Sequence, residues 1–498
     1  MTREGAPALP NGLVVFLKRE CATCRMVAPL LPAIAAAGTG PLTVITQDDP
    51  DFPDFTDFPD FTGTPDLPAG PKARHDHDLS LSWHHDIETV PTLMVVRDGV
   101  EVERTVGWVR DEWRRFTGLA DLGAELPVMR PGCGSMSVDP DVADRLEATF
   151  AGRTLQSRHL ELAEAEDEFE AMFNLGFTDG LPVVPPTPER VLRMLTGTTR
   201  DPHDVLAVVP PDLVDVTVEK VAVNAVMAGC LPEYLPWVIA AVEAACTDEF
   251  NMHGVLATTM PVGPVVICNG PGTRAIGMNG AGNALGQGNR ANLTIGRALQ
   301  LVVRNVGGGR PGEVDRATHG NPGKVSFCFP ELEQGSPFTS LSVSRGFAPT
   351  DNTVTLFAGE GPRCIVDQRA RTAPELANTF AACLRTLHNP KLVVAFDALL
   401  VVGPEHARVF AEAGWDRDRV LAELHARLQL PGSELVHGAG GIADGVAEHF
   451  ANATLPKFRP DGILLVHAGG GAGLFSAIIG GWANGATGSQ PVTRKVAP

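Results

Sequence analysis

The sequence predicts an α/β protein in which a small N-terminal domain precedes a large domain of α/β or α+β type. The chain has 498 residues, and at roughly 150 residues per domain this length suggests two or three domains. Short apolar runs of strand length alternate with longer helical patterns, which is typical of layered α/β folds. A Pro- and Gly-rich stretch separates the two parts. We therefore expect domains at 1–120 and 139–498, joined by a linker at 121–138.

The composition argues against two classes of function. Lys and Arg number 40 against 59 Asp and Glu, and the net charge of -19 disfavours broad binding to nucleic acid or to an anionic membrane. No run of about 18 apolar residues is present and the N-terminus lacks a signal-peptide pattern, so we expect a cytoplasmic protein without a membrane span. The nine cysteines are an odd number, which in a reducing compartment indicates thiols, metal ligands or redox groups rather than a disulfide framework.

The first elements of the N-terminal domain place two cysteines at the start of a helix. Residues 12–18 form an apolar run typical of a buried strand, residues 25–37 an alanine-rich helix, and residues 41–46 a second strand. Cys21 and Cys24 lie between the first strand and the helix, as a CxxC motif.

The remainder of this domain predicts a loop insertion, a hairpin and a closing helix. The acidic Asp-Phe-Pro repeat at 49–69 is of low complexity and is expected to be a surface loop. A Val-Pro-Thr turn at 90–92 precedes two strands joined at Asp98-Gly99, a dipeptide typical of tight hairpins. A helix over 110–118 ends the domain.

Two thiols at one helix N-terminus suit dithiol–disulfide exchange, because the helix lowers the pKa of the attacking thiol and the second thiol resolves the mixed disulfide. The order of strand, CxxC, helix, Val-Pro-Thr turn and hairpin resembles the thioredoxin fold over about residues 10–120. The resemblance implies that Cys21 attacks, Cys24 resolves and Pro91 is a cis-proline facing them. The sequence departs from that family at Glu20, where Trp is common, and a carboxylate beside Cys21 should raise its pKa.

A zinc site is the alternative interpretation of this motif. Cys21 and Cys24 would supply two ligands, and histidines of the same domain could complete the set: His75, His77, His84 and His85. We favour redox chemistry because the turn and hairpin follow in the expected order and the sequence contains no second CxxC.

The large domain is predicted to alternate helices and strands. Helices are expected at 139–151, 159–173, 187–195, 216–228, 232–247, 291–306, 374–388, 405–413 and 417–428, and strands at 265–268, 324–329, 353–357, 391–396 and 463–466.

A first glycine-rich loop, at 270–290, follows the strand at 265–268 and leads into a helix. Glycine lets the main chain approach a ligand, and backbone N–H groups at such a junction commonly hold an anion. Side chains in and beside the loop are therefore candidate substrate ligands: Asn269, Arg274, Asn279, Asn283 and Arg290. A literal GxGxxG occurs at 307–312, but it follows a predicted helix and contains Pro311, and no Walker motif is present. We therefore expect no nucleotide cofactor.

A second glycine-rich loop follows the strand at 463–466 and is also expected to lead into a helix. Ligands of open α/β sheets bind at the carboxyl ends of strands, where His467 and Ser476 would lie. Two such loops in one domain predict a single pocket between them, for a small anionic substrate.

A third feature is the helix at 216–228, which is apolar except for Glu219 and Asn224. Polar groups in a buried helix need partners or a purpose, and Cys230 follows directly at the helix end. We interpret Cys230 as the reacting thiol of the large domain, with Glu219 and Asn224 positioning substrate and moving protons.

Other cysteines compete with Cys230 for this role. Cys133 lies in a glycine-rich segment within reach of the CxxC site, and Cys268 ends a strand. The remaining four lie in apolar runs and are expected in the core: Cys246, Cys328, Cys364 and Cys383.

Residues 135–498 resemble a group of uncharacterised bacterial proteins, some of them associated with selenocysteine-containing redox proteins. Three segments carry this resemblance: Asp179–Thr187, Ala228–Tyr234 and Gly488–Arg494. It implies no particular reaction.

Together these features predict a thiol-dependent oxidoreductase. The CxxC domain would reduce or regenerate a cysteine of the fused catalytic domain, in a reductive cleavage or a sulfur transfer, and the fusion would raise the effective dithiol concentration. We expect a thioredoxin reductase-type electron donor, a homo-oligomer and no bound metal. Two alternatives stay open: a metal-dependent lyase or hydrolase using His253, His319, His437 or His467, and a non-enzymatic sensor of thiols or metals.

Overall fold

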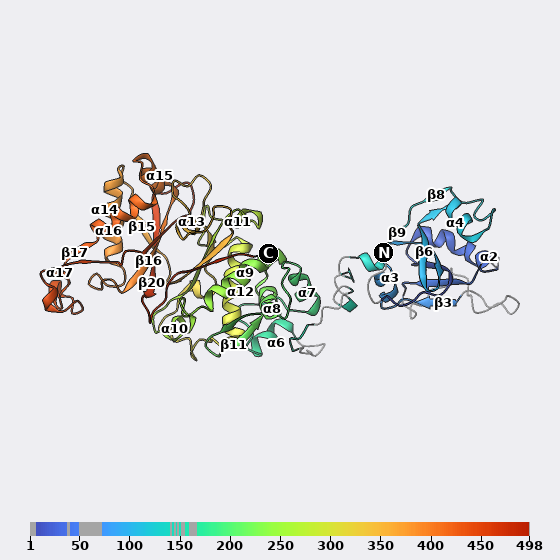
Figure 1. The fold of residues 1–498 in the computed structure, drawn as a ribbon, viewed down its shortest axis with the longest axis horizontal. Coiled ribbons are helices and arrows are strands. Elements are labelled where there is room, and N and C mark those ends of the chain that lie inside the picture. Colours follow the sequence, from blue (N-terminus) through green and yellow to red (C-terminus); the bar gives the residue numbers. More distant parts are fainter. Residues whose placement is uncertain are drawn as a thin grey trace. The chain divides into compact units, whose positions relative to one another are not determined.

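The computed structural model divides the chain into two compact units, Met1–Thr154 and Leu155–Pro498 (Figure 1). It describes residues 6–36, 40–48, 72–139, 142, 143, 146, 149, 150, 155–158 and 167–497. Both units contain helices and sheets, so the predicted α/β class is confirmed. Within the described residues, no helix has the length and apolar character needed to cross a membrane. The acidic repeat at 49–69 lies outside the described residues.

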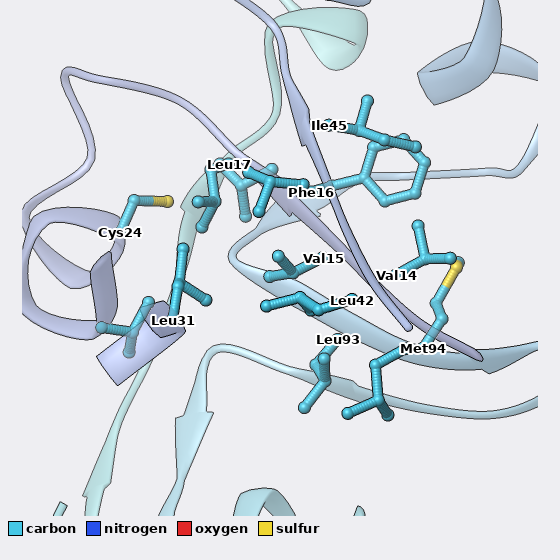
Figure 2. Packing of buried hydrophobic residues seen from close by; sticks show 14 of the residues in the cluster. Val14, Val15, Phe16, Leu17, Cys24, Leu31, Leu42, Ile45, Leu93 and Met94 are labelled. Carbon is cyan, nitrogen blue, oxygen red and sulfur yellow. The ribbon is translucent and has the colours of Figure 1, made fainter. Parts of the chain in front are cut away.

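The N-terminal unit is built on a five-stranded sheet of order β3-β2-β1-β5-β6. Strands β1 to β3 are parallel, β5 is antiparallel to β1, and β6 is antiparallel to β5. Their bounds are Gly12–Leu17 for β1, Leu42–Thr46 for β2, Lys72–His75 for β3, Thr92–Arg97 for β5 and Val100–Val106 for β6. Both faces of β1 are buried: Val14 and Phe16 point to one side and Val15 and Leu17 to the other (Figure 2).

The helices of this unit are short. The predicted helix at 25–37 is divided into α1 (Ala22–Val27), a 3-10 turn η1 (Ala28–Leu30) and α2 (Leu31–Ala36). Pro29 and Pro32 explain the division, because proline cannot donate the backbone hydrogen bonds of a continuous helix. The unit also contains α3 (Ser80–His84) and α4 (Arg110–Thr117).

The predicted hairpin forms at the expected turn. Asp98 and Gly99 join β5 to β6 with φ angles of 52° and 75°. Two successive positive φ angles are what a type I′ turn requires, and they match the twist of the flanking strands.

The segment at 121–138, expected to be a linker, belongs instead to the N-terminal unit. Its strands β8 (Met129–Arg130) and β9 (Cys133–Gly134) pair with β7 (Trp108–Val109) and β4 (Thr89–Val90), and the turn η3 (Met136–Val138) follows. The buried Gln47 amide donates to Ser135 Oγ at 2.6 Å. The glycines of this segment allow it to pack closely against neighbouring strands. From the sequence alone, such a glycine-rich segment looks the same as an interdomain linker.

The C-terminal unit contains an eight-stranded sheet made of two similar halves. In one half β12 is parallel to β13 and antiparallel to β14, and in the other β16 is parallel to β19 and antiparallel to β20. The last strand of each half pairs with the other half: β15, which follows β14 in the chain, pairs with β20, and β21, which follows β20, pairs with β14. The bounds are β12 Gly263–Asn269, β13 Cys328–Pro330, β14 Thr353–Gly359, β15 Arg363–Val366, β16 Phe396–Val402, β19 Ile463–His467, β20 Phe475–Ala483 and β21 Val492–Lys495.

Helices pack on each half of this sheet. In the first half α9 contacts β14 and β21, and in the second Phe380 of α14, Phe410 of α15 and Leu424 of α16 share one buried cluster with Leu400 of β16. The helices are α6 Glu168–Asn174, α7 Pro188–Leu195, α8 Val218–Ala228, α9 Leu235–Ala245, α10 Met252–Ala257, α11 Gly272–Ala275, α12 Arg290–Asn305, α13 Leu341–Ser344, α14 Ala373–Arg385, α15 Pro404–Glu412, α16 Arg417–Arg427 and α17 Gly432–Leu435. The 3-10 turns are η4 Pro232–Tyr234, η5 Pro322–Lys324, η6 Ala439–Gly441 and η7 Glu448–Phe450. Two further strand pairs are β10 Val205–Val209 with β11 Val214–Thr217, and β17 Gln429–Pro431 with β18 Thr454–Pro456.

Three of the elements predicted from the sequence differ from those in the structure. The strand predicted at 391–396 is displaced, since β16 begins at Phe396, and the one at 324–329 is β13, which begins at Cys328. The prediction of a helix after the second glycine-rich loop is wrong, because the strand β20 follows that loop. Pairing with β15 and β16 on its two sides stabilises β20 as a strand, and these partners are distant in the sequence. Of the helices expected at 139–151 and 159–173, large parts lie outside the described residues.

Candidate functional site

The two cysteines of the CxxC motif occupy the start of α1. Cys21 is the N-cap residue, and its Sγ accepts a hydrogen bond from the backbone N–H of Cys24 at 3.3 Å. The same sulfur lies 3.3 Å from the carbonyl oxygen of Val90, and the Val90–Pro91 peptide bond is cis, as expected. Cys24 is buried in one cluster with Leu17 and Leu31 (Figure 2).

The two thiols of this pair differ strongly in acidity. A hydrogen bond from the Cys24 side chain, supported by one from Cys133 and by backbone N–H groups, lowers the pKa of Cys21 to about 5 against the opposing effect of burial. Burial raises the pKa of Cys24 well above its usual value. Glu20, which we expected to raise the pKa of Cys21, is exposed to solvent, and the hydrogen bonds to the sulfur prevail. The lowered pKa of Cys21 favours its thiolate form at neutral pH, and the raised pKa of Cys24 favours its thiol form.

A third thiol lies beside this pair. Cys133 of β9 is the register partner of Val90 in β4, the residue whose carbonyl oxygen contacts Cys21 Sγ. Its hydrogen bond with the Cys21 side chain raises the pKa of Cys133. Sequence analysis placed Cys133 near the CxxC site but in a flexible segment, whereas the structure fixes it in a strand pair.

The segment Met129–Gly134, here called the cover segment, packs closely against the site. Thr23, between the two cysteines, donates from Oγ1 to the Pro131 carbonyl oxygen at 2.7 Å. A Cβ atom on Gly132 would lie 2.6 Å from the Val90 carbonyl oxygen, so only glycine fits there. Cys21 has an exposed fraction of 0%, while Cys133 is partly exposed.

In the C-terminal unit the two glycine-rich loops line one cavity of about 410 Å³, as the sequence predicts. Asn283 and Gly286 come from the first loop and Gly470 and Gly473 from the second. The loops contact each other directly, since the backbone N–H of Gly469 donates to Gly280 at 2.9 Å. This space is here called the glycine-loop cavity.

One cysteine lines the glycine-loop cavity, and it is not Cys230. Cys364 of β15 pairs with Ala477 of β20, is exposed, and borders the cavity together with Ser476. The expectation that Cys364 lies in the core is wrong, because β15 is an edge strand with its neighbour on one side only. The apolar residues around Cys364 in the sequence did not indicate that its side chain would be exposed at the cavity.

Ser476 and His406 form a hydrogen-bonded pair at the same cavity. Ser476 Oγ lies 2.8 Å from His406 Nδ1 and accepts the backbone N–H of Gly403 at 3.1 Å. His406 Nε2 contacts the Asp367 carbonyl oxygen at 3.2 Å, so Nε2 carries the proton and Nδ1 accepts the serine hydroxyl. Burial lowers the pKa of His406, which keeps the ring neutral at neutral pH. The sequence analysis identified Ser476 but missed His406, which lies on α15.

The other predicted ligands lie away from the glycine-loop cavity. Arg274 and Asn279 line a second cavity of about 420 Å³ with Glu331 and Glu333. Arg290 donates from Nε to the Gly229 carbonyl oxygen at 2.9 Å. Among the described residues that line the glycine-loop cavity, none is Arg or Lys.

Asn269 and His467 belong to a buried polar cluster around Glu331. Glu331 accepts hydrogen bonds from Asn269 Nδ2 and from the Leu341 backbone, both at 2.7 Å, and lies 3.3 Å from Arg417. His467 Nδ1 lies 2.9 Å from the Leu332 carbonyl oxygen, and burial lowers its pKa. These contacts join the ends of β13 and β19.

Cys230, Glu219 and Asn224 do not form the predicted reacting group. Cys230 has an exposed fraction of 6%, and burial raises its pKa to about 12. The Glu219 carboxylate accepts the backbone N–H groups of Gln156 and Ser157 at 2.8 to 3.1 Å. Asn224 accepts a hydrogen bond from Asn305 at 2.9 Å. Both polar residues thus have structural partners.

Cys268 and Cys328 lie close together inside the sheet. Their sulfur atoms are 3.8 Å apart, both side chains are buried, and burial raises the pKa of Cys328. Neither thiol lines the glycine-loop cavity. Cys328 is in the core, as predicted, and Cys246 and Cys383 are partly exposed.

Within the part of the chain that the structure describes, no three His, Cys, Asp or Glu side chains are grouped to hold a metal ion. His84 contacts the rings of Trp83 and Phe150, and His85 Nε2 lies 2.9 Å from the Pro7 carbonyl oxygen. These histidines are thus engaged within the unit rather than turned toward Cys21 as a ligand set.

Comparison with protein-family models found no match, and searches of the curated proteins and of the solved structures found none either.

Proposed function

We propose that this protein is a thiol-dependent oxidoreductase whose N-terminal unit resembles thioredoxin in its chemistry. Cys21 is the attacking thiolate and Cys24 the resolving thiol. The observation that carries this proposal is the opposite direction of their pKa shifts within one helix turn. A thiolate that exists at neutral pH attacks a disulfide, and a buried neighbour three residues later is placed to displace the product.

The electrons of this dithiol serve a reaction on a small molecule held in the glycine-loop cavity. The cavity is bordered by Gly403 and Pro404, where α15 begins, and a helix N-terminus favours a negatively charged group. We therefore propose an anionic substrate, favoured by the positive end of α15 and bound by backbone N–H groups of the glycine-rich loops rather than by Arg274 or Arg290. The Gly403 N–H is already bonded to Ser476 Oγ, and Pro404 has no N–H to donate. The reaction is a reductive cleavage or a sulfur transfer that leaves Cys21–Cys24 as a disulfide.

Cys364 replaces Cys230 as the thiol that this reaction uses. It is exposed at the cavity, whereas Cys230 is enclosed and its pKa is raised to about 12. The covalent link between the two units raises the effective concentration of the dithiol toward such a thiol. We propose a cytoplasmic, homo-oligomeric enzyme that is reduced by a thioredoxin reductase-type donor.

A disulfide-reductase assay on the full chain tests this proposal. Dithiothreitol is the electron source and a disulfide-linked peptide the acceptor. The protein should accelerate reduction, Cys21→Ser should abolish the acceleration, and Cys246→Ser should not change it. A Cys21→Ser variant as active as the unaltered chain would contradict the proposal.

One observation favours a second candidate function, hydrolysis by acyl transfer. Ser476 donates to the neutral ring of His406, and a serine hydroxyl beside such a base is a nucleophile. A fluorophosphonate reagent would label Ser476 if this function holds, and labelling would be lost in His406→Gln. Absence of labelling in the folded chain would contradict it.

A further inference from the structure

We propose that Cys133 is a third redox thiol, which carries disulfide exchange between the buried Cys21–Cys24 pair and disulfides outside the protein. The inference rests on the proposed function, since it assumes that Cys21 and Cys24 form a disulfide. The resemblance to thioredoxin implies roles for Cys21, Cys24 and Pro91, and it implies none for Cys133.

Solvent reaches Cys133 but not the two cysteines of the CxxC motif. Cys21 and Cys24 both have exposed fractions of 0%, so an external disulfide cannot reach Cys21 while the cover segment is in place. Cys133 belongs to that cover segment and is partly exposed. It is the thiol of this site that solvent reaches first.

The pairing of β4 with β9 positions Cys133 beside the CxxC turn. The β4–β9 pair places Cys133 directly opposite Val90, and Val90 contributes the carbonyl oxygen 3.3 Å from Cys21 Sγ. The Cys21 and Cys133 side chains are hydrogen-bonded to each other, so the two sulfurs are neighbours. Thr23 holds the cover segment in this position through the Pro131 carbonyl oxygen.

The Cys21 and Cys133 sulfurs share one proton in the reduced site. The reduced site holds one negative charge between two hydrogen-bonded sulfurs, and such a pair titrates as a unit. Transfer of the proton from Cys133 to Cys21 moves the thiolate to the partly exposed sulfur. The thiolate with the higher pKa is also the stronger nucleophile.

The exchange balances in three steps with an external disulfide, R–S–S–R, as oxidant. The Cys133 thiolate attacks one sulfur, forming Cys133–S–S–R and releasing one R–S⁻. Cys21 passes its proton to that R–S⁻, and the Cys21 thiolate then attacks Cys133 Sγ, forming Cys21–Cys133 and releasing the second R–S⁻. Cys24 passes its proton to a released thiolate and attacks Cys21 Sγ, forming Cys21–Cys24 and freeing Cys133. Two protein thiols are oxidised, and one external disulfide is reduced to two thiols.

Trapping the Cys21–Cys133 disulfide, which forms in the second step, tests the proposal directly. The full-length Cys24→Ser variant cannot complete the last step, so oxidation with glutathione disulfide should yield a Cys21–Cys133 disulfide by peptide mapping, with no glutathione attached. A persistent glutathione adduct on Cys21 or Cys133, or no reaction, would overturn the proposal.

The rate at which Cys21 and Cys24 are oxidised in a chain that retains both cysteines is the second measurement. Cys133→Ser keeps a side chain that donates to Cys21 but removes the exchanging sulfur. Oxidation of Cys21–Cys24 by glutathione disulfide should slow at least tenfold, while the fraction oxidised at equilibrium stays unchanged, and Cys246→Ser should match the unaltered chain. An unchanged rate in Cys133→Ser would refute the relay and leave the CxxC couple standing, whereas failure of Cys21–Cys24 to oxidise in any variant would refute the proposed function itself.

Discussion

Thr23 donates a hydrogen bond of 2.7 Å from Oγ1 to the carbonyl oxygen of Pro131, 108 residues further along the chain. This contact joins the CxxC turn to the cover segment beside Cys21, whose exposed fraction is 0%. We therefore expect Thr23, which lies between the two cysteines of the motif, to control access to them. Thr23 thus has a structural role in addition to its place in the motif.

Thr23→Val should loosen the cover segment. Valine keeps the shape but cannot donate, and loss of the hydrogen bond to the Pro131 carbonyl oxygen should lower the free energy of unfolding by about 1 kcal/mol. Cys21 should then react faster with iodoacetamide, measured by mass spectrometry of the reduced protein. Thr23→Ser, which retains the hydroxyl, is the control, and equal alkylation rates in both variants would show that this contact does not govern access.

The acidity of Cys21 predicts a pH dependence of the reduced protein. Thiolate ultraviolet absorbance should rise with a midpoint near pH 5 and disappear in Cys21→Ser. Cys24→Ala should move the midpoint upward further than Cys133→Ala, because the hydrogen bond from Cys24 is the larger cause of the lowered pKa.

The same shift predicts the sign of the stability change. Between the lowered pKa of about 5 and the usual value of 9.0, the folded state binds fewer protons at Cys21 than the unfolded state does. The stability of the reduced protein should therefore increase with pH across this window, and the contribution of Cys21 should be lost as the pH falls through 5. Denaturant titrations of reduced Cys21→Ser, which lacks this dependence, provide the comparison.

The two candidate thiols of the C-terminal unit should react very differently. Cys364 is exposed at the glycine-loop cavity, while Cys230 is enclosed with its pKa raised to about 12. In the native protein, a maleimide should label Cys364 within the time that leaves Cys230 unlabelled, and Cys230 should react only after denaturation. Preferential labelling of Cys230 in the folded chain would return it to the mechanism.

The buried cluster around Glu331 should be important for the stability of the C-terminal unit. Glu331→Ala leaves Arg417 buried without its carboxylate, which typically costs about 3–5 kcal/mol. Glu434→Ala removes the partner of Arg385 in an exposed pair and should cost less than about 1 kcal/mol. Thermal and denaturant unfolding of the two variants measures the contrast, and a similar loss in both would show that the Glu331 cluster contributes little.

Local sequence patterns predicted the elements whose signal is contained within a few residues. The Asp98-Gly99 turn, the cysteines at the start of α1 and the strands that precede the glycine-rich loops are of this kind. The prediction of one cavity between the loops also succeeded, because both loops follow strands of one sheet.

Features that depend on distant partners could not be predicted. Residues 475–483 form a strand because β15 and β16 pair with them, and Cys364 is exposed because its strand lies at an edge. Glu219 suggested catalysis, yet backbone N–H groups more than 60 residues earlier satisfy it. A sequence shows that a buried carboxylate needs a partner, but not whether that partner is a substrate or the chain itself.

We propose that Cys21 and Cys24 form a reversible redox couple. An equilibrium titration of the full chain in mixtures of reduced and oxidised glutathione, with thiols counted and disulfides mapped, tests it most directly. We predict one reversible transition in which Cys21 and Cys24 convert between two thiols and one disulfide. Stoichiometric zinc bound by Cys21 and Cys24, with both thiols resistant to the most oxidising mixture, would contradict the claim.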